Sequence, residues 1–278
     1  MTALTAVKSR VPTLSHILPC QVGGVVTAVA LLDDDVFVLG EYSQQVHDYD
    51  AVTFSLRRYV TVHGLGEYTS SMASCARNRC LYLSDWNNAS VHRVELSGSN
   101  AVKTWSVAIR PRGLSVNIAH NLVVACFGAN KVQEYTTNGS LVREICLQAG
   151  VTDPWQAVQL SSGDYAVNQC RSPGVVSVVG VDGQLVRTYG QSKASGDGQI
   201  KGPTGLAVTK KDGILVIDQL KNRILSINRS KGYVQELALS VEGGIRSPRG
   251  LCLDESRGRL YVSEFGGCRV LVFDGFRF

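Results

Sequence analysis

Residues 202–228 read GPTGLAVTKKDGILVIDQLKNRILSIN, and this stretch decides the fold. An apolar segment at 205–208 is followed by a Lys-Asp-Gly turn, a second apolar segment at 214–217, a polar loop and a third apolar segment at 224–227. Alternating and β-branched side chains favour strands, and the Asp212-Gly213 pair is a strong hairpin signal. The stretch therefore predicts three consecutive antiparallel strands.

The same unit recurs along the whole chain. With the first, the copies at 27–50, 72–95, 110–136, 153–180 and 247–274 make six. The residues at one equivalent position are separated by 45, 41, 42, 50 and 46 residues, and they are Gly40, Asp85, Cys126, Asn168, Asp218 and Glu264. A period of this length is typical of the four-stranded blades of a β-propeller.

A fourth strand is expected after five of the copies, at 56–62, 101–107, 141–147, 185–190 and 234–239. The sixth copy has no sequence left for one. Because an unpaired edge would expose backbone hydrogen-bonding groups, we expect a strand within 11–18 (VPTLSHIL) to pair there and close the ring. The sequence thus predicts an all-β, six-bladed β-propeller with four-stranded antiparallel blades, formed as a single domain over residues 1–278.

The pattern in PTGLAV…LVID…NRILSI and in PRGLCL…LYVSE…CRVLVFD resembles the NHL repeat. Taken over nearly the whole chain, the sequence is similar to the C-terminal propeller of animal TRIM-NHL proteins. That resemblance implies an NHL-type propeller in a post-transcriptional regulator, with one face that binds single-stranded or hairpin RNA. It also implies an alternative, in which the propeller recruits protein partners or substrates to a ubiquitin-ligase or repressor complex.

The net charge of +5 is mild, so the placement of the charges matters more than their sum. In a meander blade, the connections between blades and the loops between second and third strands share one face. The basic residues predicted on that face are Arg110, Arg112, Lys131, Arg171, Lys201, Lys221, Arg223, Arg246, Arg249 and Arg269. The aromatic residues predicted there are Tyr42, Trp86, Phe127, Trp155 and Phe265.

Basic groups interleaved with aromatic rings are what single-stranded nucleic acid requires, since cations neutralise phosphates and each stacked base contributes about 1–3 kcal/mol. We therefore predict that these residues bind RNA, with a protein or peptide on the same face as the alternative. A structural interpretation also stands for Arg223 and Arg269, which lie near the start of a third strand and could bridge neighbouring blades.

No catalytic or metal motif is visible. The five histidines are scattered without an H-x-x-x-H spacing, and no nucleophile elbow occurs. We therefore expect no enzymatic activity, no catalytic residue, no metal and no cofactor.

The eight cysteines fit no metal-binding spacing, although Cys75 and Cys80 flank a turn and could form a disulfide. There is no apolar run long enough to cross a membrane and no signal-peptide pattern. We accordingly expect a cytoplasmic propeller that does not bind membranes and is monomeric in isolation.

Overall fold

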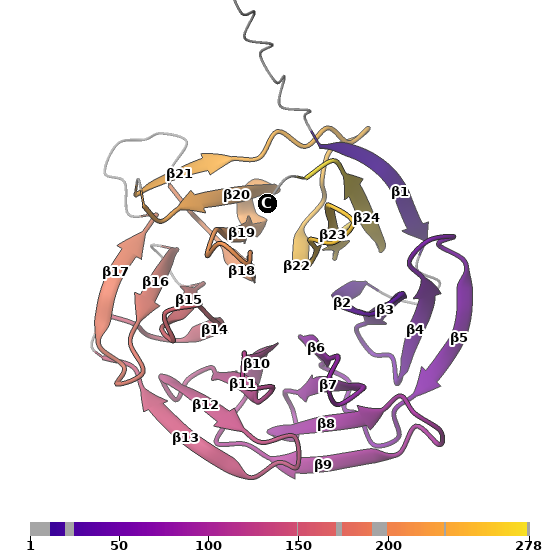
Figure 1. The fold of residues 1–278 in the computed structure, drawn as a ribbon, viewed down its shortest axis with the longest axis horizontal. Coiled ribbons are helices and arrows are strands. Elements are labelled where there is room, and N and C mark those ends of the chain that lie inside the picture. Colours follow the sequence, from indigo (N-terminus) through magenta and orange to yellow (C-terminus); the bar gives the residue numbers. More distant parts are fainter. Residues whose placement is uncertain are drawn as a thin grey trace, which may run out of the picture.

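The computed structural model describes residues 12–19, 25–148, 150–170, 174–190, 199–230 and 232–276. These residues form six four-stranded antiparallel sheets arranged radially around a central axis (Figure 1). The helix content of this described part is one short 3-10 turn, η1 (Gln219–Lys221). The predicted all-β, six-bladed propeller is therefore confirmed.

Five blades are built from consecutive strands, with the first strand nearest the axis and the fourth at the rim (Figure 1). Blade 1 contains β2 (Val26–Leu32), β3 (Asp35–Gly40), β4 (Gln45–Asp50) and β5 (Leu56–Thr61), and blade 2 contains β6 (Met72–Cys75), β7 (Cys80–Asp85), β8 (Ser90–Glu95) and β9 (Val102–Ser106). Blade 3 contains β10 (Pro111–Val116), β11 (Leu122–Cys126), β12 (Lys131–Tyr135) and β13 (Leu141–Cys146), and blade 4 contains β14 (Pro154–Gln159), β15 (Tyr165–Gln169), β16 (Val175–Val179) and β17 (Leu185–Tyr189). Blade 5 contains β18 (Pro203–Val208), β19 (Ile214–Asp218), β20 (Arg223–Asn228) and β21 (Tyr233–Glu236).

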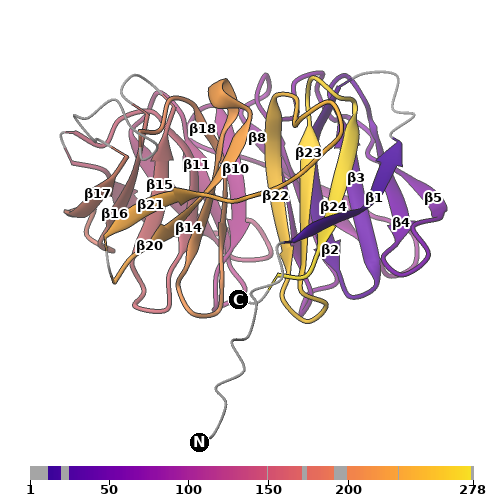
Figure 2. The same ribbon diagram turned by 90° about the horizontal axis from the view of Figure 1, so that it is seen from above.

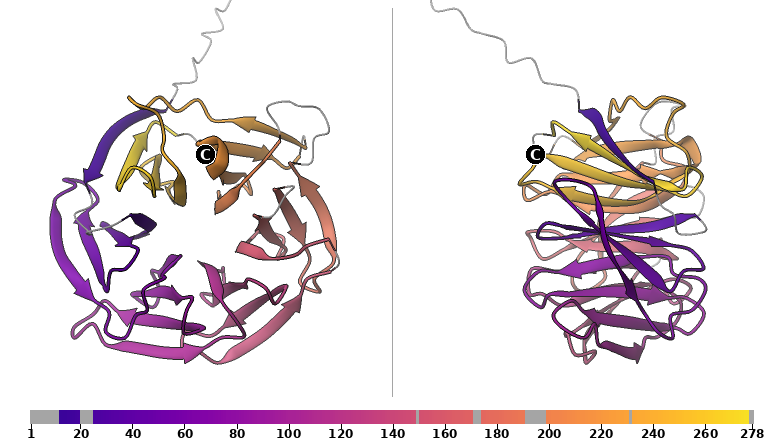
Figure 3. Two further views of the ribbon diagram at one scale, coloured as in Figure 1. Left: turned by 180° about the vertical axis from the view of Figure 1, so that it is seen from behind. Right: turned by 90° about the vertical axis from the view of Figure 1, so that its right-hand side faces the viewer.

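Blade 6 combines the two ends of the described chain. Its strands are β22 (Pro248–Asp254), β23 (Arg259–Glu264), β24 (Arg269–Asp274) and β1 (Thr13–Pro19). β1 pairs antiparallel with β24 from Thr13 opposite Asp274 to Pro19 opposite Arg269. The indigo strand lies along the rim beside the yellow strands in both the edge-on and the reverse views (Figures 2 and 3). The predicted closing strand is therefore confirmed, although Val11 lies outside the described residues.

The core lies between blades rather than within them. Each pair of neighbouring blades encloses a buried apolar cluster, including the pair formed by blades 6 and 1. Phe37 and Leu83, for example, belong to the cluster between blades 1 and 2, and both are fully buried. Because strand side chains alternate between two faces, every blade supplies one face to each of its neighbours. The ring is consequently held together by a repeating set of apolar interfaces.

The outer strand of blade 5 is shorter than predicted. β21 ends at Glu236, although the apolar pattern continues to Leu239. Beyond that point the Leu237 amide still donates to the Ile224 carbonyl, and Ser240 then forms a parallel bridge with Thr13 of β1. The chain leaves its own blade because it runs toward the closing strand, which the local sequence could not indicate.

Cys75 and Cys80 lie directly opposite each other on β6 and β7, where both are buried free thiols. Within the described ranges, no helix has the length and apolar character needed to cross a bilayer.

Candidate functional site

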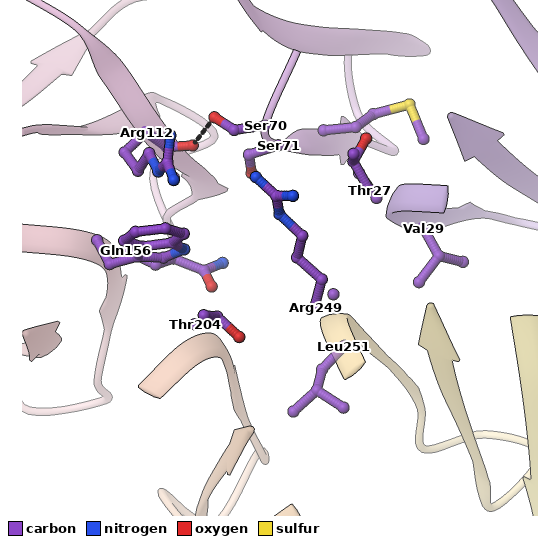
Figure 4. Close-up of a pocket in the computed structure, with 14 residues that line it drawn as sticks. Thr27, Val29, Ser70, Ser71, Arg112, Gln156, Thr204, Arg249 and Leu251 are labelled. Carbon is purple, nitrogen blue, oxygen red and sulfur yellow. Dashed lines mark hydrogen bonds between the residues drawn. The ribbon is translucent and has the colours of Figure 1, made fainter. Parts of the chain in front are cut away.

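Arg112 and Arg249 occupy equivalent positions in blades 3 and 6. Each is the second residue of an innermost strand and directly follows the proline that begins it, Pro111 in β10 and Pro248 in β22. Both side chains line the mouth of the central channel. In Figure 4, Arg249 extends across the channel toward Ser70 and Ser71 of the connection between blades 1 and 2. Two residues about 140 positions apart are thus brought to one site by the propeller symmetry.

A cleft of about 330 Å³ opens on this face beside the two arginines, and its walls include Glu41, Tyr68, Ser70 and Trp86. An adjoining cavity of about 30 Å³ shares Ser70, Arg112 and Arg249 with the cleft and is lined otherwise by the innermost strands. A cavity that small has room for little more than a water molecule. The cleft is therefore closed at its channel end.

The Arg112 guanidinium is sandwiched between two tryptophans. Its Cζ atom lies 4.6 Å from the ring centroid of Trp86 and 3.7 Å from that of Trp155. The Nε atom is buried and has no hydrogen-bond partner among the described residues. Burial, followed by the charge of Arg249, lowers the pKa of Arg112 to about 10. The group therefore carries its charge at neutral pH, but at a free-energy cost to the fold.

Arg249 is held in a similar way by one ring, since its Cζ atom lies 4.9 Å from the ring centroid of Phe265. Burial lowers its pKa, and the charge of Glu41 acts in the opposite direction. In the described part of the chain, neither Arg112 nor Arg249 forms an ion pair with a carboxylate. Two partly desolvated guanidiniums near each other, without a paired acid, form a site suited to an anion.

Four of the other predicted basic residues are engaged within the protein. Arg223 contacts Asp218 at 3.2 Å and Glu236 at 3.0 Å, and Arg269 pairs with the buried Glu264. The Nζ atom of Lys131 lies 2.7 Å from the Glu144 carboxylate, and that of Lys221 donates to the Gln199 carbonyl at 2.9 Å.

The acids of two of these pairs also hold the start of a blade. One Asp218 oxygen accepts from the Lys201 and Gly202 amides at 3.0 Å each, and a Glu264 oxygen accepts from the Arg246 amide at 2.6 Å. Each of these two carboxylates therefore contacts an arginine of its own blade on one side and the backbone of the incoming connection on the other. This arrangement supports a structural role for both arginines, although within one blade and its incoming connection rather than as the predicted bridge between neighbouring blades.

Three predicted basic residues remain exposed on the same face: Arg110, Lys201 and Arg246. The Arg110 guanidinium lies over the Trp86 ring at 5.4 Å, next to the cleft. Arg171 lies outside the described residues.

Three of the predicted aromatic residues form one cluster, and the other two, Tyr42 and Phe265, have separate partners. Phe127 contacts both Trp86 and Trp155, with ring centroids 5.6 Å and 6.4 Å apart, and all three residues are half-buried. Tyr42 is 60% exposed, and its hydroxyl lies 3.3 Å from that of Tyr68. Phe265 packs against Arg249, so the rings nearest the channel position the guanidiniums.

Sequence reasoning missed Tyr68 and Ser70. Both lie in the connection before β6, at the same place in blade 2 that Arg110 and Arg112 occupy in blade 3. The repeat alignment could have drawn attention to them by position. Their polar and aromatic character without charge gave no reason to select them.

No group of three or more His, Cys, Asp or Glu side chains suited to a metal ion occurs among the described residues. His92 is buried, with its Nε2 atom 3.2 Å from Asp85 and its Nδ1 atom 3.0 Å from the Thr104 hydroxyl. His47 is likewise buried in β4.

Residues 246–273 match the family model of the NHL repeat. No curated protein matches the chain. Among solved structures, virginiamycin B lyase from Staphylococcus aureus is similar at 11% identity with a TM-score of 0.68, and the match covers 93% of this chain and 98% of that one. Hydrazine synthase from Kuenenia stuttgartiensis is similar at 13% identity with a TM-score of 0.66, covering 97% and 98%. An auxiliary nutrient binding protein from Bacteroides thetaiotaomicron is similar at 15% identity with a TM-score of 0.66, covering 90% of this chain and 69% of that one.

These structures correct the prediction that the chain is not an enzyme. Virginiamycin B lyase and a streptogramin B lyase share its propeller fold, so the lack of a visible catalytic motif was a wrong basis for that prediction. A propeller assembles a site from several blades that are distant in sequence, and no local motif need mark it. At these identities the likeness shows the fold alone. The chain is a six-bladed β-propeller whose sixth blade contains an NHL repeat.

Proposed function

We propose that this propeller binds single-stranded or hairpin RNA on the face that carries Arg112 and Arg249. One observation carries the proposal: Arg112 and Arg249 line the cleft, Arg110 lies over the Trp86 ring of its wall, and none of the three has an ion-paired carboxylate in the described structure. Four cations farther out on the same face, Lys131, Lys221, Arg223 and Arg269, are paired or bonded to backbone, whereas Lys201 and Arg246 are exposed. The charges left for a ligand are therefore the cluster at the cleft together with these two exposed residues.

Phosphate contacts supply the affinity in this mechanism. Each neutralised phosphate releases counterions, and the logarithm of the binding constant for a single strand falls with the logarithm of salt concentration by about 0.7 per contact. Four arginines would give a slope of roughly −3.

Tyr42 and Tyr68 are the exposed rings available for stacking on bases. Trp86 and Trp155 already hold Arg112, so we assign them to positioning that guanidinium.

The wider role we propose is that of a TRIM-NHL-like post-transcriptional regulator. The NHL repeat at 246–273 and the resemblance of the chain to TRIM-NHL propellers support this role. Arg249 lies within the matched repeat, so the matched segment contributes directly to the proposed site.

A protein or peptide ligand is the second candidate. Tyr42, Tyr68 and Leu220 are 60%, 42% and 72% exposed, and all three lie in connections or loops of this face. Exposed tyrosines are enriched at protein interfaces, where a ring and a hydroxyl can both be used. A peptide held by such contacts would show a shallow salt dependence.

The test is a titration of the protein with a randomised pool of short RNAs at two salt concentrations. We expect salt-sensitive binding that enriches a sequence, and we expect the double variant Arg246→Glu, Arg249→Glu to weaken it by roughly a hundredfold. The reversal is compatible with the fold because the new carboxylate at 249 would face Arg112. The matched control is Arg77→Glu, Lys210→Glu, which reverses two exposed charges in turns of the opposite face.

Unchanged affinity of the Arg246→Glu, Arg249→Glu protein would refute this choice of face. Weak binding with no salt dependence and no enriched sequence would favour the peptide ligand. Circular dichroism of each variant separates a loss of binding from a loss of folding.

A further inference from the structure

The cleft beside Arg112 and Arg249 is a dead end. It opens on the face, and the cavity that adjoins it at the channel has a volume of about 30 Å³. That space is too small for a base or a sugar. Any group that reaches the two guanidiniums must therefore enter from the face and stop beside them.

The residues that line the cleft carry a formal charge of +1, and Arg110 at its edge raises the total to +2. Arg112 and Arg249 line the cleft, Arg110 lies over the Trp86 ring of its wall, and Glu41 supplies the single negative charge. Three positive charges and one negative charge leave a formal excess of two. A phosphate monoester carries about −1.5 to −2 at neutral pH, whereas an internal phosphodiester carries only −1. The excess therefore matches a terminal phosphate better than an internal one.

The charged donors in the cleft are the guanidinium groups of Arg112 and Arg249. The Ser70 hydroxyl donates to the Arg112 carbonyl at 2.7 Å and is already used, and the neutral polar groups of the lining include Tyr68 and Asn87. Each guanidinium has five N–H groups in a planar fork that matches two phosphate oxygens at once. The stacking of Arg112 between Trp86 and Trp155 fixes the orientation of its fork.

We infer that this cleft binds the terminal phosphate monoester of an RNA strand, so that the face recognises a strand end. A terminal phosphate can enter the narrow end between the two guanidiniums, whereas an internal phosphate has a nucleotide on both sides and could reach only the open side of the cleft. This inference rests on the proposed function and specifies which part of the RNA the site takes. The remaining nucleotides would then lie across the face toward Tyr42 and Arg246.

The experiment compares three oligoribonucleotides of one sequence, bearing a 5′-phosphate, a 3′-phosphate or no terminal phosphate. We expect one of the two phosphorylated strands to bind about tenfold or more tightly than the strand without a terminal phosphate. Adenosine monophosphate and inorganic phosphate serve as competitors that contain the anion without the strand. They should displace the phosphorylated strand and leave the affinity of the other unchanged.

Three variants test the assignment to this cleft. Arg249→Gln should remove the preference for the phosphorylated strand, and Arg249→Lys should restore part of it because the charge returns without the fork. Glu41→Gln should strengthen binding of the phosphorylated strand severalfold, since a repulsive charge is removed from the wall. This gain cannot arise from unfolding. Arg77→Gln, on the opposite face, should change neither affinity.

The outcomes separate the inference from the proposed function. Equal affinity for all three strands would overturn strand-end recognition and leave RNA binding intact. Displaceable binding of adenosine monophosphate without binding of any strand would uphold the phosphate cleft and overturn the RNA function. A phosphoserine peptide that binds more tightly than either phosphorylated strand would overturn the choice of RNA as the source of the phosphate.

Discussion

Arg112 and Arg223 are both withdrawn from solvent, yet their surroundings predict opposite effects on stability. Arg223 contacts the carboxylate of Asp218, whose side chain has no exposed surface. Arg112 has no such partner, and burial lowers its pKa to about 10. We expect Arg223→Met to lower the free energy of unfolding by about 3 kcal/mol, because it leaves a buried carboxylate without its cation. We expect Arg112→Met to raise it by about 1 kcal/mol, because an uncompensated buried charge disappears.

Chemical denaturation at pH 7 measures both effects, with Arg77→Met as the control at an exposed position, where a change below about 0.5 kcal/mol is expected. The sign for Arg112 follows from linkage: a folded-state pKa below that of the unfolded chain means that the charged form opposes folding, and this opposition persists at every pH below about 10. A loss of stability in Arg112→Met as large as that in Arg223→Met would show that the guanidinium belongs to the packing of the tryptophans. The site would then lose its main indication of a ligand.

Of these two arginines, only the local contact of Arg223 could be anticipated from the sequence. The pairing of Arg223 with Asp218 spans five residues, and a structural role for Arg223 was predictable from its place at the start of a third strand, although the prediction expected a bridge between blades. The contact between Arg112 and Trp155 joins blades 3 and 4 across 43 residues. No local pattern records such a contact, because it depends on how neighbouring blades are oriented.

At the scale of the element, β1 carries the closure of the ring, and two adjacent residues test it. Leu18 is 1% exposed within the cluster that joins blades 6 and 1, whereas Ile17 is 43% exposed on the other side of the strand. We expect Leu18→Ala to lower the free energy of unfolding by about 3 kcal/mol and to reduce the melting temperature accordingly. Ile17→Ala removes a similar number of atoms and should cost less than about 1 kcal/mol, because its side chain is already partly solvated.

Thermal denaturation followed by circular dichroism measures both changes. Equal and small effects of the two substitutions would mean that β1 contributes little to ring closure, despite its pairing with β24.

The closing strand was predictable because the sixth blade lacked an outer strand, and pairing with the N-terminal segment is the simplest way to satisfy its free edge. Most strand bounds were also predictable, since turns such as the one at Asp212 (φ 61°) are specified by residues that tolerate a left-handed conformation. The early end of β21 was not, because Ser240 is drawn to Thr13 by tertiary pairing.

For the whole molecule, repetition made the ring predictable but not the distribution of charge over its faces. Six similar units imply six similar blades, and the separations between equivalent positions gave their number. Cations within one blade nevertheless differ in their partners, since Arg269 is paired with Glu264 while Arg249 in the same blade lacks an ion-paired carboxylate among the described residues. The repeat determines the position of a residue within its blade and the face on which it lies. Its neighbours in the adjoining blades decide whether its charge is left for a ligand.

The same arrangement of clusters between blades predicts how the protein unfolds. Each blade shares its apolar core with both neighbours, so loss of one interface exposes the faces of two blades. We therefore expect a single cooperative transition in which a substitution at one interface destabilises the whole ring.

The tryptophans Trp86, Trp105 and Trp155 lie in blades 2 and 4, away from the interface of blades 6 and 1 that contains Leu18. Leu18→Ala should consequently shift the midpoint of tryptophan fluorescence by the same amount as that of circular dichroism. A fluorescence midpoint that stays at the wild-type value while the circular dichroism midpoint falls would show that blades 2 to 4 unfold separately, and the ring would then be a set of independent units rather than one cooperative core.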